Sequence, residues 1–262
     1  MKLWDFYLWA LGRPAFAPVH TALLKVALRG LGFQAWWSPR VSGEEWVIDR
    51  LAIVSPQARI LDIGANVGAY AALVRAKAPR ARVLALEPNP ETFKLLAGRA
   101  KDHGFDALNL GAGKMVGNAT LYHRMSDSTS PHASLHASVL GNSTDVASHT
   151  ISVTTIDRIV QDHDIENIEF LKIDTEGSEL DVLLGAQNSI QSGKIDWVQF
   201  EFNTMNSAAR VFFEDFQAVL PGYRFYRLLS KGVIPVGDSP WSLPNLFMYQ
   251  NLLAVRPGAP AP

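Results

Sequence analysis

Leu61-Asp62-Ile63-Gly64-Ala65-Asn66-Val67-Gly68 joins an apolar run to a tight turn that carries two glycines. Gly64 permits a turn in which a Cβ would clash, and Gly68 allows the following helix to pack closely. The N-terminus of that helix offers unpaired N–H groups to an anion. The stretch therefore predicts a strand, a binding turn and a helix, the unit from which nucleotide-binding α/β sheets are built.

The spacing of this turn departs from the dinucleotide fingerprint. That fingerprint would place glycines at positions 64, 66 and 69, but only Gly64 is a glycine. A nicotinamide or flavin cofactor is therefore disfavoured. Asp62 and Asn66 instead suit a ligand with an amino-acid moiety, because its carboxylate takes backbone N–H groups and its ammonium takes acceptors. S-adenosylmethionine has both groups.

A second apolar run, residues 83–86, ends in Glu87 and Pro88. In doubly wound sheets an acidic residue at about this distance from the first strand lies beside the glycine turn and can accept both hydroxyls of a ribose. A solvated strand end is the alternative for Glu87. With the turn, Glu87 completes a predicted nucleoside site of the following residues: Asp62, Gly64, Asn66, Gly68 and Glu87.

Composition limits the class of protein. The chain has 262 residues, of which 48% are hydrophobic and 19% charged, enough for one large α/β domain. The formal net charge of −1 argues against nucleic acid as the main partner. Without cysteine the chain can form no disulfide, thiolate zinc site or cysteine nucleophile. A reducing cytoplasm, where we expect the protein, is compatible with this.

The pattern divides the chain into an N-terminal helical extension or cap (1–53), a binding domain (54–256) with a polar insert (124–150), and a disordered tail (257–262). Strands are predicted at 59–63, 82–87, 107–110, 168–173, 197–202, 223–229 and 247–255, with antiparallel additions at 119–123 and 150–153. Helices are predicted at 44–53, 68–76, 90–103, 155–161, 178–190 and 207–220, after an extended turn at 38–43. Such alternation predicts a Rossmann-like, doubly wound, mostly parallel sheet.

The N-terminal extension is apolar and rich in tryptophan, yet charged residues and prolines interrupt it. It matches neither a clean membrane-spanning helix nor a signal peptide. Two interpretations stay open. The extension packs on the core as a cap, or it lies at a membrane interface and approaches lipid or a lipid-linked substrate.

The polar insert gathers four of the seven histidines in or beside it: His123, His132, His136 and His149. A long polar loop in a compact domain is often a lid over an active site. A solvated loop and a metal site are the other interpretations, although the histidine spacings match no helical or finger pattern.

The segment 171–179 carries acidic groups at a second strand end. Its strand ends at Asp174, and a helix opens near Ser178. Because ligands bind beyond the carboxyl ends of parallel strands, Asp174 and Glu176 should face the crevice of the first turn. Glu201, at the end of the next strand, should reach it too. Glu179 is predicted to complement the helix dipole.

Taken together, these motifs resemble the FkbM-type methyltransferases, S-adenosylmethionine-dependent enzymes that mostly methylate hydroxyls of sugars and related natural products. The resemblance runs from about residue 59 to 201 and rests on the following segments: 62–68, 87–88, 134–135, 153–157, 171–179, 184–186 and 201. It implies the class I methyltransferase fold, and it places the turn of Asn109 near the adenine. Residues 109–114 depart from the family pattern, with glycine and lysine in place of alanine and an acid.

This resemblance implies an O-methyltransferase whose acceptor is a carbohydrate: a glycan, a glycolipid or a glycosylated natural product. Methyl transfer needs an acceptor oxygen held in line with the methyl carbon and a group that removes its proton. Asp174, which we also expect to lie beside the methyl donor, is the first candidate; Glu176, Glu201 and His136 are reserves. A divalent cation such as Mg²⁺ held by Asp174 and a second acid is the alternative.

Two other functions compete with this interpretation. A nicotinamide-dependent dehydrogenase needs the same fold, but it is disfavoured by the missing glycine at position 66. A non-enzymatic module with a residual nucleoside site is disfavoured by the clustered acids. The sequence does not indicate which sugar is methylated, the oligomeric state, or whether the extension contacts a membrane.

Overall fold

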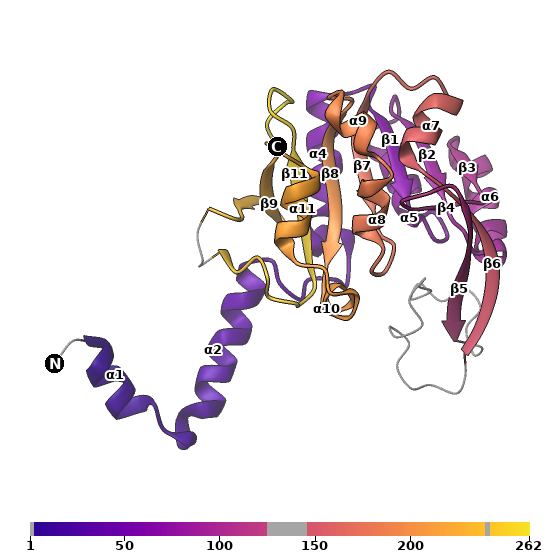
Figure 1. Cartoon of the computed structure of the whole chain (residues 1–262). Helices are drawn as coiled ribbons and strands as arrows, with labels where there is room; N and C mark the ends of the chain where they lie inside the picture. The colour runs from indigo at the N-terminus through magenta and orange to yellow at the C-terminus, as the bar shows by residue number, and fades with distance from the viewer. Residues whose placement is uncertain (1–2, 125–145, 239–241) are drawn as a thin grey trace.

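The computed structural model describes residues 3–124, 146–238 and 242–262. A central eight-stranded sheet in the order β10-β9-β11-β8-β7-β1-β2-β3 carries helices on both faces (Figure 1). Its strands are β1 (Arg59–Ile63), β2 (Arg82–Leu86), β3 (Asp106–Leu108), β7 (Ile168–Ile173), β8 (Ile195–Phe202), β9 (Arg224–Leu229), β10 (Gly232–Pro235) and β11 (Gln250–Val255). The predicted doubly wound sheet is confirmed.

The parallel half of the sheet aligns its strand ends. β1 pairs in parallel with β2 and β7, and β7 pairs in parallel with β8. Ile63 is therefore in register with Leu86 on one side and Ile173 on the other, and Ile173 with Phe200. The residues that follow these four strands meet at one edge of the sheet, which is where the sequence predicted the site.

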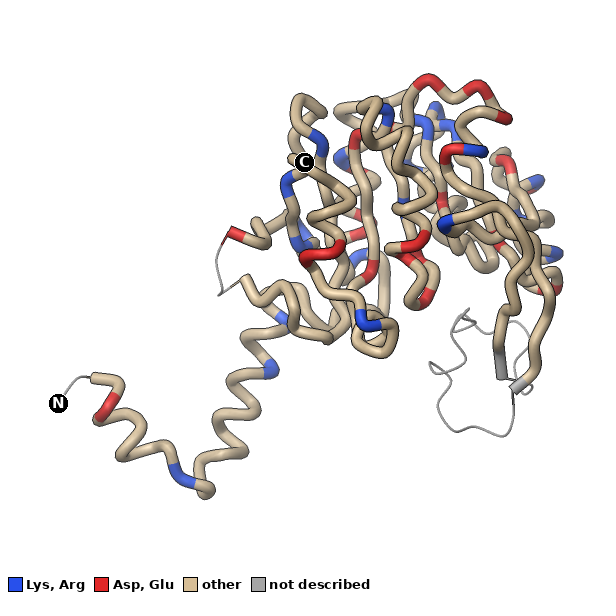
Figure 2. The backbone as a smooth tube through the Cα atoms, in the orientation of Figure 1, with Lys and Arg blue, Asp and Glu red and all other residues tan. Residues whose placement is uncertain are grey.

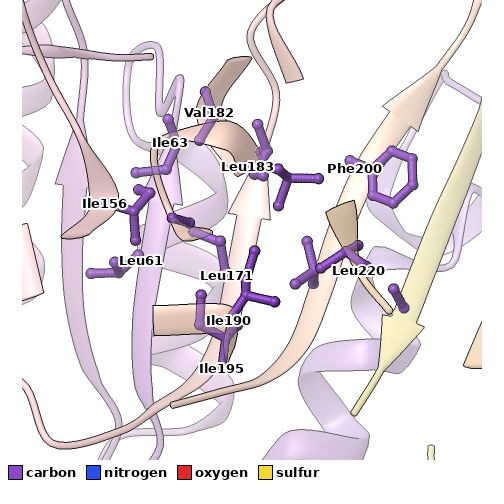
Figure 3. Close-up of a cluster of buried hydrophobic side chains, with 14 of the residues drawn as sticks. Leu61, Ile63, Ile156, Leu171, Val182, Leu183, Ile190, Ile195, Phe200 and Leu220 are labelled. Carbon is purple, nitrogen blue, oxygen red and sulfur yellow. The ribbon is translucent and has the colours of Figure 1, made fainter. Parts of the chain in front are cut away.

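Alternation along each strand sends side chains to two separate cores. One face is covered by α4 (Glu44–Val54), α5 (Ala69–Lys77) and α6 (Pro90–His103), and the other by α7 (Ile156–Asp162), α8 (Glu179–Leu184), α9 (Gln187–Gln191) and α11 (Phe213–Val219). Figure 3 shows the second core, where Leu61 and Leu171 lie between the helices and the sheet. The two cores hold the strand ends in fixed positions.

A smaller sheet of three strands stands beside the edge that carries the site. It contains β4 (Gly111–Ala112), β5 (Gly117–Arg124) and β6 (Val146–Thr154), with β5 and β6 antiparallel. The predicted antiparallel additions are confirmed, and both are longer than expected. The intervening part of the insert, with the predicted lid and His136, lies outside the described residues.

Two predicted helices are each divided in the structure. The pattern at 178–190 forms α8 and α9, which are separated by Gly185 and Ala186; a Cβ on Gly185 would collide with the Gly113 carbonyl oxygen. The pattern at 207–220 forms α10 (Thr204–Ala209) and α11, separated by Arg210 in the left-handed region with φ 59°. The sequence also missed β10 and the short α3 (Pro39–Ser42), which replaces an expected extended turn.

The N-terminal residues form an arm that projects away from the sheet (Figure 1). It consists of α1 (Leu3–Leu11), the 3-10 turn η1 (Pro14–Phe16) and α2 (Ala17–Gly30). α1 buries none of its residues, and α2 buries Leu28. Among the described residues, no helix combines the length and apolar character needed to cross a bilayer.

The C-terminal residues, for which we expected a disordered tail, contact the body of the protein. Trp197 Nε1 donates a hydrogen bond to the carbonyl oxygen of Pro260 at 2.9 Å, and Arg50 Nη2 donates to that of Ala261 at 3.2 Å. These bonds hold residues 257–262 against α4 and the sheet.

Candidate functional site

A cavity of about 580 Å³ opens at the carboxyl edge of the parallel strands. This volume is within the roughly 300–1,000 Å³ that is usual for small-molecule sites. Its walls come from the turns after β1, β2 and β7, from the end of β8, and from the segments around 34–36, 110–112, 203–205 and 249.

Backbone contact joins the first turn to the end of β7. Gly64 has a φ of 78°, and a Cβ at this position would collide with the carbonyl oxygen of Asp174. Asp174 N donates to the carbonyl oxygen of Ile63 at 2.9 Å. Asn66 also has a positive φ, 48°, which is uncommon for a residue with a side chain. The glycine at position 64 thus permits a close approach that fixes Asp174 beside the turn.

Glu87 is buried at the wall of the cavity, with 7% of its surface exposed. Its Oε2 accepts from Asn66 N at 3.0 Å and its Oε1 from Asn89 N at 2.8 Å. Burial raises the pKa of Glu87 to about 7, and the two backbone N–H groups act in the opposite direction. Glu87 therefore ties the first turn to the start of α6, and its carboxylate keeps lone pairs for a ligand.

A buried cation lies behind the cavity. Lys172 Nζ is 2.9 Å from Asp174 Oδ2 and 3.9 Å from Asp62 Oδ1, and it lies over the ring of Tyr70 at 5.0 Å. Asp62 is fully buried, and burial raises its pKa to about 6. Among the described residues, neither carboxylate oxygen of Asp62 has a hydrogen-bond partner.

Glu179 shapes the loop between β7 and α8. Its carboxylate accepts from Thr175 N at 3.0 Å and from Gly177 N at 3.1 Å. Within this loop Glu176 adopts a φ of 52° and Gly177 a φ of 105°. The predicted role of Glu179 at the helix dipole is thus incomplete. Its carboxylate holds a strained turn that carries Glu176 into the cavity wall.

Glu201 belongs to a hydrogen-bonded group at the end of β8. Asn203 Nδ2 donates to Glu201 Oε2 at 3.3 Å, and the Tyr249 hydroxyl also forms a hydrogen bond with Glu201. Burial, with the negative charges of Asp174 and Glu176, holds the pKa of Glu201 well above its usual range.

Most of the predicted site residues meet at this cavity. Its lining includes Gly64, Asn66, Glu87, Asp174, Glu176 and Glu201. Asp62 lies behind the wall, and Gly68 packs on α6, where a Cβ would come within 2.6 Å of Leu96 Cδ1. Asn109 uses its amide to donate to the carbonyl oxygens of Glu87 and Pro88. The described residues contain no group of three or more potential metal ligands.

The sequence did not predict that one wall of the cavity comes from segments far from the motifs in the chain. Gln34, Trp36, Asn203 and Tyr249 line the cavity, and Gln34 N donates to the carbonyl oxygen of Tyr249 at 2.8 Å. None of these residues lies in a motif, so no local signal marks them. Only the pairing of β11 with β8, which brings Gln250 opposite Phe202, places Tyr249 beside Glu201.

Comparison with known families identifies the domain that carries this site. The model of the methyltransferase FkbM domain matches residues 62–225, more than half of the chain. The chain belongs to the FkbM methyltransferase family. This is the family that the motifs in the glycine turn and the β7 loop resemble.

Two curated relatives are similar to parts of this FkbM-family chain. The hexuronic acid methyltransferase AglP of Haloferax volcanii is 28% identical over 61% of this chain and 63% of its own. Methyltransferase 1 of Beauveria bassiana is 28% identical over 54% of this chain and 65% of its own. The chain thus spans slightly less than two thirds of either relative.

The solved structures similar to this chain include two methyltransferases in complex with SAH. The O-methyltransferase from Bacillus cereus in complex with SAH covers 96% of both chains with 11% identity and a TM-score of 0.43. The N-terminal domain of human METTL16 in complex with SAH covers 81% of this chain and 68% of its own, with 13% identity and a TM-score of 0.43.

Proposed function

We propose that this FkbM methyltransferase transfers a methyl group from S-adenosylmethionine to a hydroxyl of a sugar in a glycan, a glycolipid or a glycosylated natural product. The proposal rests on one observation: a single cavity is lined both by residues that fit a methyl donor and by acidic residues that could act on an acceptor. The Gly64 turn and Glu87 form one side, and Asp174 and Glu201 form the other.

The residues of the first side fit the proposed donor. Glu87 is positioned to accept the ribose hydroxyls, and the turn of Gly64 and Asn66 to hold the amino-acid end. Thr92 Oγ1 and Ser178 Oγ belong to cavity-lining residues, are buried, and have no hydrogen-bond partner among the described residues. Such buried groups usually find a partner, and a polar ligand would supply one. When bound, S-adenosylmethionine supplies a methyl carbon activated by its sulfonium.

The residues of the second side suggest how the acceptor loses its proton. Lys172 holds Asp174 Oδ2, which orients the carboxylate and balances its charge. Burial raises the pKa of Glu201, which favours its protonated form. Two acids in such different environments suit different roles. We assign Asp174 as the proton acceptor and Glu201 as a hydrogen-bond donor that orients the acceptor.

The chemistry at the reacting atoms then balances. The acceptor oxygen bonds to the methyl carbon as the carbon–sulfur bond breaks, its proton passes to Asp174, and the sulfur leaves as a neutral thioether. Glu176 remains a reserve base, and His136 a reserve outside the described residues. A divalent cation held by Asp174 and a second acid is the alternative to a base.

A carbohydrate acceptor is supported by the relative from Haloferax volcanii, which is a hexuronic acid methyltransferase. The cavity wall of this chain also suits a sugar. Asn203 and Thr204 supply polar groups, and Trp36 and Tyr249 supply aromatic faces.

Calorimetric titration with S-adenosylmethionine and, separately, with NAD tests the donor site. We expect binding of S-adenosylmethionine alone, weakened at least tenfold in Glu87→Ala and retained in Asp174→Asn. Glu91→Gln, on the exposed side of α6, is the matched control and should bind normally. Binding of NAD alone would favour a dehydrogenase, and a folded protein that binds neither would favour a non-enzymatic module.

A further inference from the structure

The arm presents an unusually large uncovered apolar surface. Trp4 and Trp9 of α1 are 71% and 67% exposed, and Val26 of α2 is 72% exposed. The other large apolar residues exposed on the arm and its root are Leu3, Phe6, Leu8, Phe16, Val19, Leu23, Leu24, Leu31, Trp36 and Trp37. Exposed apolar side chains gathered on one segment mark a surface that a membrane or another molecule covers.

The distribution of these side chains around α1 indicates what covers it. Leu3, Trp4, Phe6, Leu8 and Trp9 occupy all sides of the helix rather than one stripe, since successive residues are about 100° apart. A groove on a protein covers one side of a helix, whereas the acyl region of a bilayer can surround it. Tryptophan is also favoured at the boundary between acyl chains and headgroups.

The positive charge of the arm indicates which kind of surface it binds. The first 37 residues contain four basic residues and one acid, although the whole chain has a net charge of −1. Two of these cations lie beside exposed tryptophans, Arg13 at 5.8 Å from the ring of Trp9 and Arg29 at 5.8 Å from that of Trp37. A second copy of the arm would bring like charges together, whereas anionic lipid headgroups would attract them.

The arm is held as a bent pair of helices that begins at the cavity. The Tyr7 hydroxyl lies 3.0 Å from His20 Nδ1, a hydrogen bond that joins α1 to α2. After the arm, Gln34 and Trp36 line the cavity. The ring centroid of Trp36 lies 6.0 Å from that of Tyr249. In Figure 2 the arm is mostly uncharged and extends away from the body.

We propose that residues 3–30 dock on a bilayer that contains anionic lipid, with the apolar side chains of α1 and α2 in the interface and Arg13, Lys25 and Arg29 at the headgroups. Docking would hold the cavity close to that surface. It does not depend on methyl transfer, whereas delivery of a lipid-linked acceptor to the cavity rests on the proposed function.

Vesicle flotation of the purified full chain tests the proposal. The probes are vesicles of phosphatidylcholine and of a phosphatidylcholine–phosphatidylglycerol mixture, at low and high salt. We expect flotation with the anionic mixture, reduced at high salt. Arg13→Gln/Lys25→Gln/Arg29→Gln should lower the partition coefficient by roughly 100-fold, since each of the three cations near an anionic surface contributes about fivefold. Lys101→Gln/Lys114→Gln/Lys231→Gln, with the same loss of charge on the body, should match the wild type.

A second pair of variants isolates the apolar contact. Trp4→Ser/Trp9→Ser should lose most of the bound fraction, while Met115→Ser/Val116→Ser, which removes exposed apolar side chains at the β4–β5 turn, should not. Circular dichroism and thermal unfolding establish that each variant is folded. Failure of the wild type to float with anionic vesicles would overturn docking. So would a dimer in light scattering that Trp4→Ser/Trp9→Ser converts to monomers without any vesicle binding.

Discussion

Lys172 offsets the negative charge of the carboxylates of Asp62 and Asp174 at the end of the sheet. It is 5% exposed on a strand that is otherwise largely apolar, and it lies between Asp62 and Asp174. A buried charge without its counterion is costly, so the pair depends on the cation more than an exposed pair would. The sequence placed Asp174 at this edge but gave Lys172 no role, because a lysine on a strand carries no signal of its partner.

Lys172→Met should destabilise the protein by about 2–4 kcal/mol, because it leaves Asp62 and Asp174 without their cation. The free energy of unfolding in urea measures this loss. Lys101→Met, an exposed change of the same type on α6, should alter it by less than about 0.5 kcal/mol. Equal effects of the two changes would contradict the role of Lys172.

Asp174→Asn should lower turnover by roughly 10²–10⁴-fold, because it removes the proposed proton acceptor. Glu201→Gln should lower it by less than about tenfold, since the amide resembles the protonated acid favoured there by the raised pKa. Steady-state methyl transfer to a sugar acceptor measures both. The assignment of roles is wrong if Glu201→Gln is the more severe change.

Glu87 should make the stability of the ligand-free protein depend on pH. Because its pKa in the folded state is raised to about 7, folding is favoured by protonation. Its contribution is complete below the ordinary glutamate pKa and is lost as the pH rises through about 7. The free energy of unfolding should therefore fall by about 1 kcal/mol between about pH 6 and about pH 8.

Urea denaturation at a series of pH values checks this dependence. Glu87→Gln should remove most of the slope, and Glu91→Gln, an exposed acid of the same helix start, should leave it unchanged. A slope that survives in Glu87→Gln would assign the pH dependence to another group.

At the scale of elements, Asp157 connects α7 to α9. Its carboxylate accepts from Asn188 N at 2.9 Å, from Ser189 N at 2.8 Å and from Ser189 Oγ at 2.6 Å. It therefore satisfies backbone donors in the first turn of α9, although it lies on another helix. This contact supports a new helix start within a segment predicted as one helix.

Asp157→Ala should cost about 1–2 kcal/mol, the usual effect of removing a helix cap. Asp162→Ala, at the exposed end of the same helix, should cost less than about 1 kcal/mol, because it removes a surface ion pair. Thermal unfolding of the two variants gives the comparison, and equal shifts in melting temperature would argue against the cap.

The elements that the sequence predicted are those whose signal is local. β1, β2, β7 and β8 are marked by apolar runs and strand-end acids, and the Gly64 turn by its spacing. Gly185, between α8 and α9, instead lies against Gly113, a residue far away in the chain. In the same way Gln34 and Tyr249 enter the cavity only through pairing at the far side of the sheet.

At the scale of the whole molecule, the arm and the body have separate sources of stability. α1 and α2 together bury only Leu28 among their described residues. Just beyond them, Phe33 is fully buried beneath the guanidinium of Arg227, which lies 3.9 Å from its ring centroid. Arg227 in turn donates to Gln250 Oε1 at 2.7 Å and to the carbonyl oxygen of Ser242 at 2.6 Å.

Removal of residues 1–30 should leave the melting temperature of the body within a few degrees of the full chain, whereas removal of residues 1–35 should lower it substantially. The longer deletion exposes Arg227 and removes the buried ring of Phe33, a change that typically costs about 3–5 kcal/mol. Calorimetry of the two truncated forms measures the difference. A large loss with the shorter deletion would show that the arm is part of the body.

The close approach of Gly64 to Asp174 limits which parts of the cavity can change independently. The Gly64 turn and the end of β7 are joined through main-chain atoms, so a change in the backbone of either strand end disturbs both. The opposite wall is assembled from three unrelated segments, around Trp36, Asn203 and Tyr249. If the proposed function holds, we expect acceptor preference to change through exchanges in those segments while the unit of Gly64 and Asp174 stays fixed, so these segments are the places to redesign selectivity.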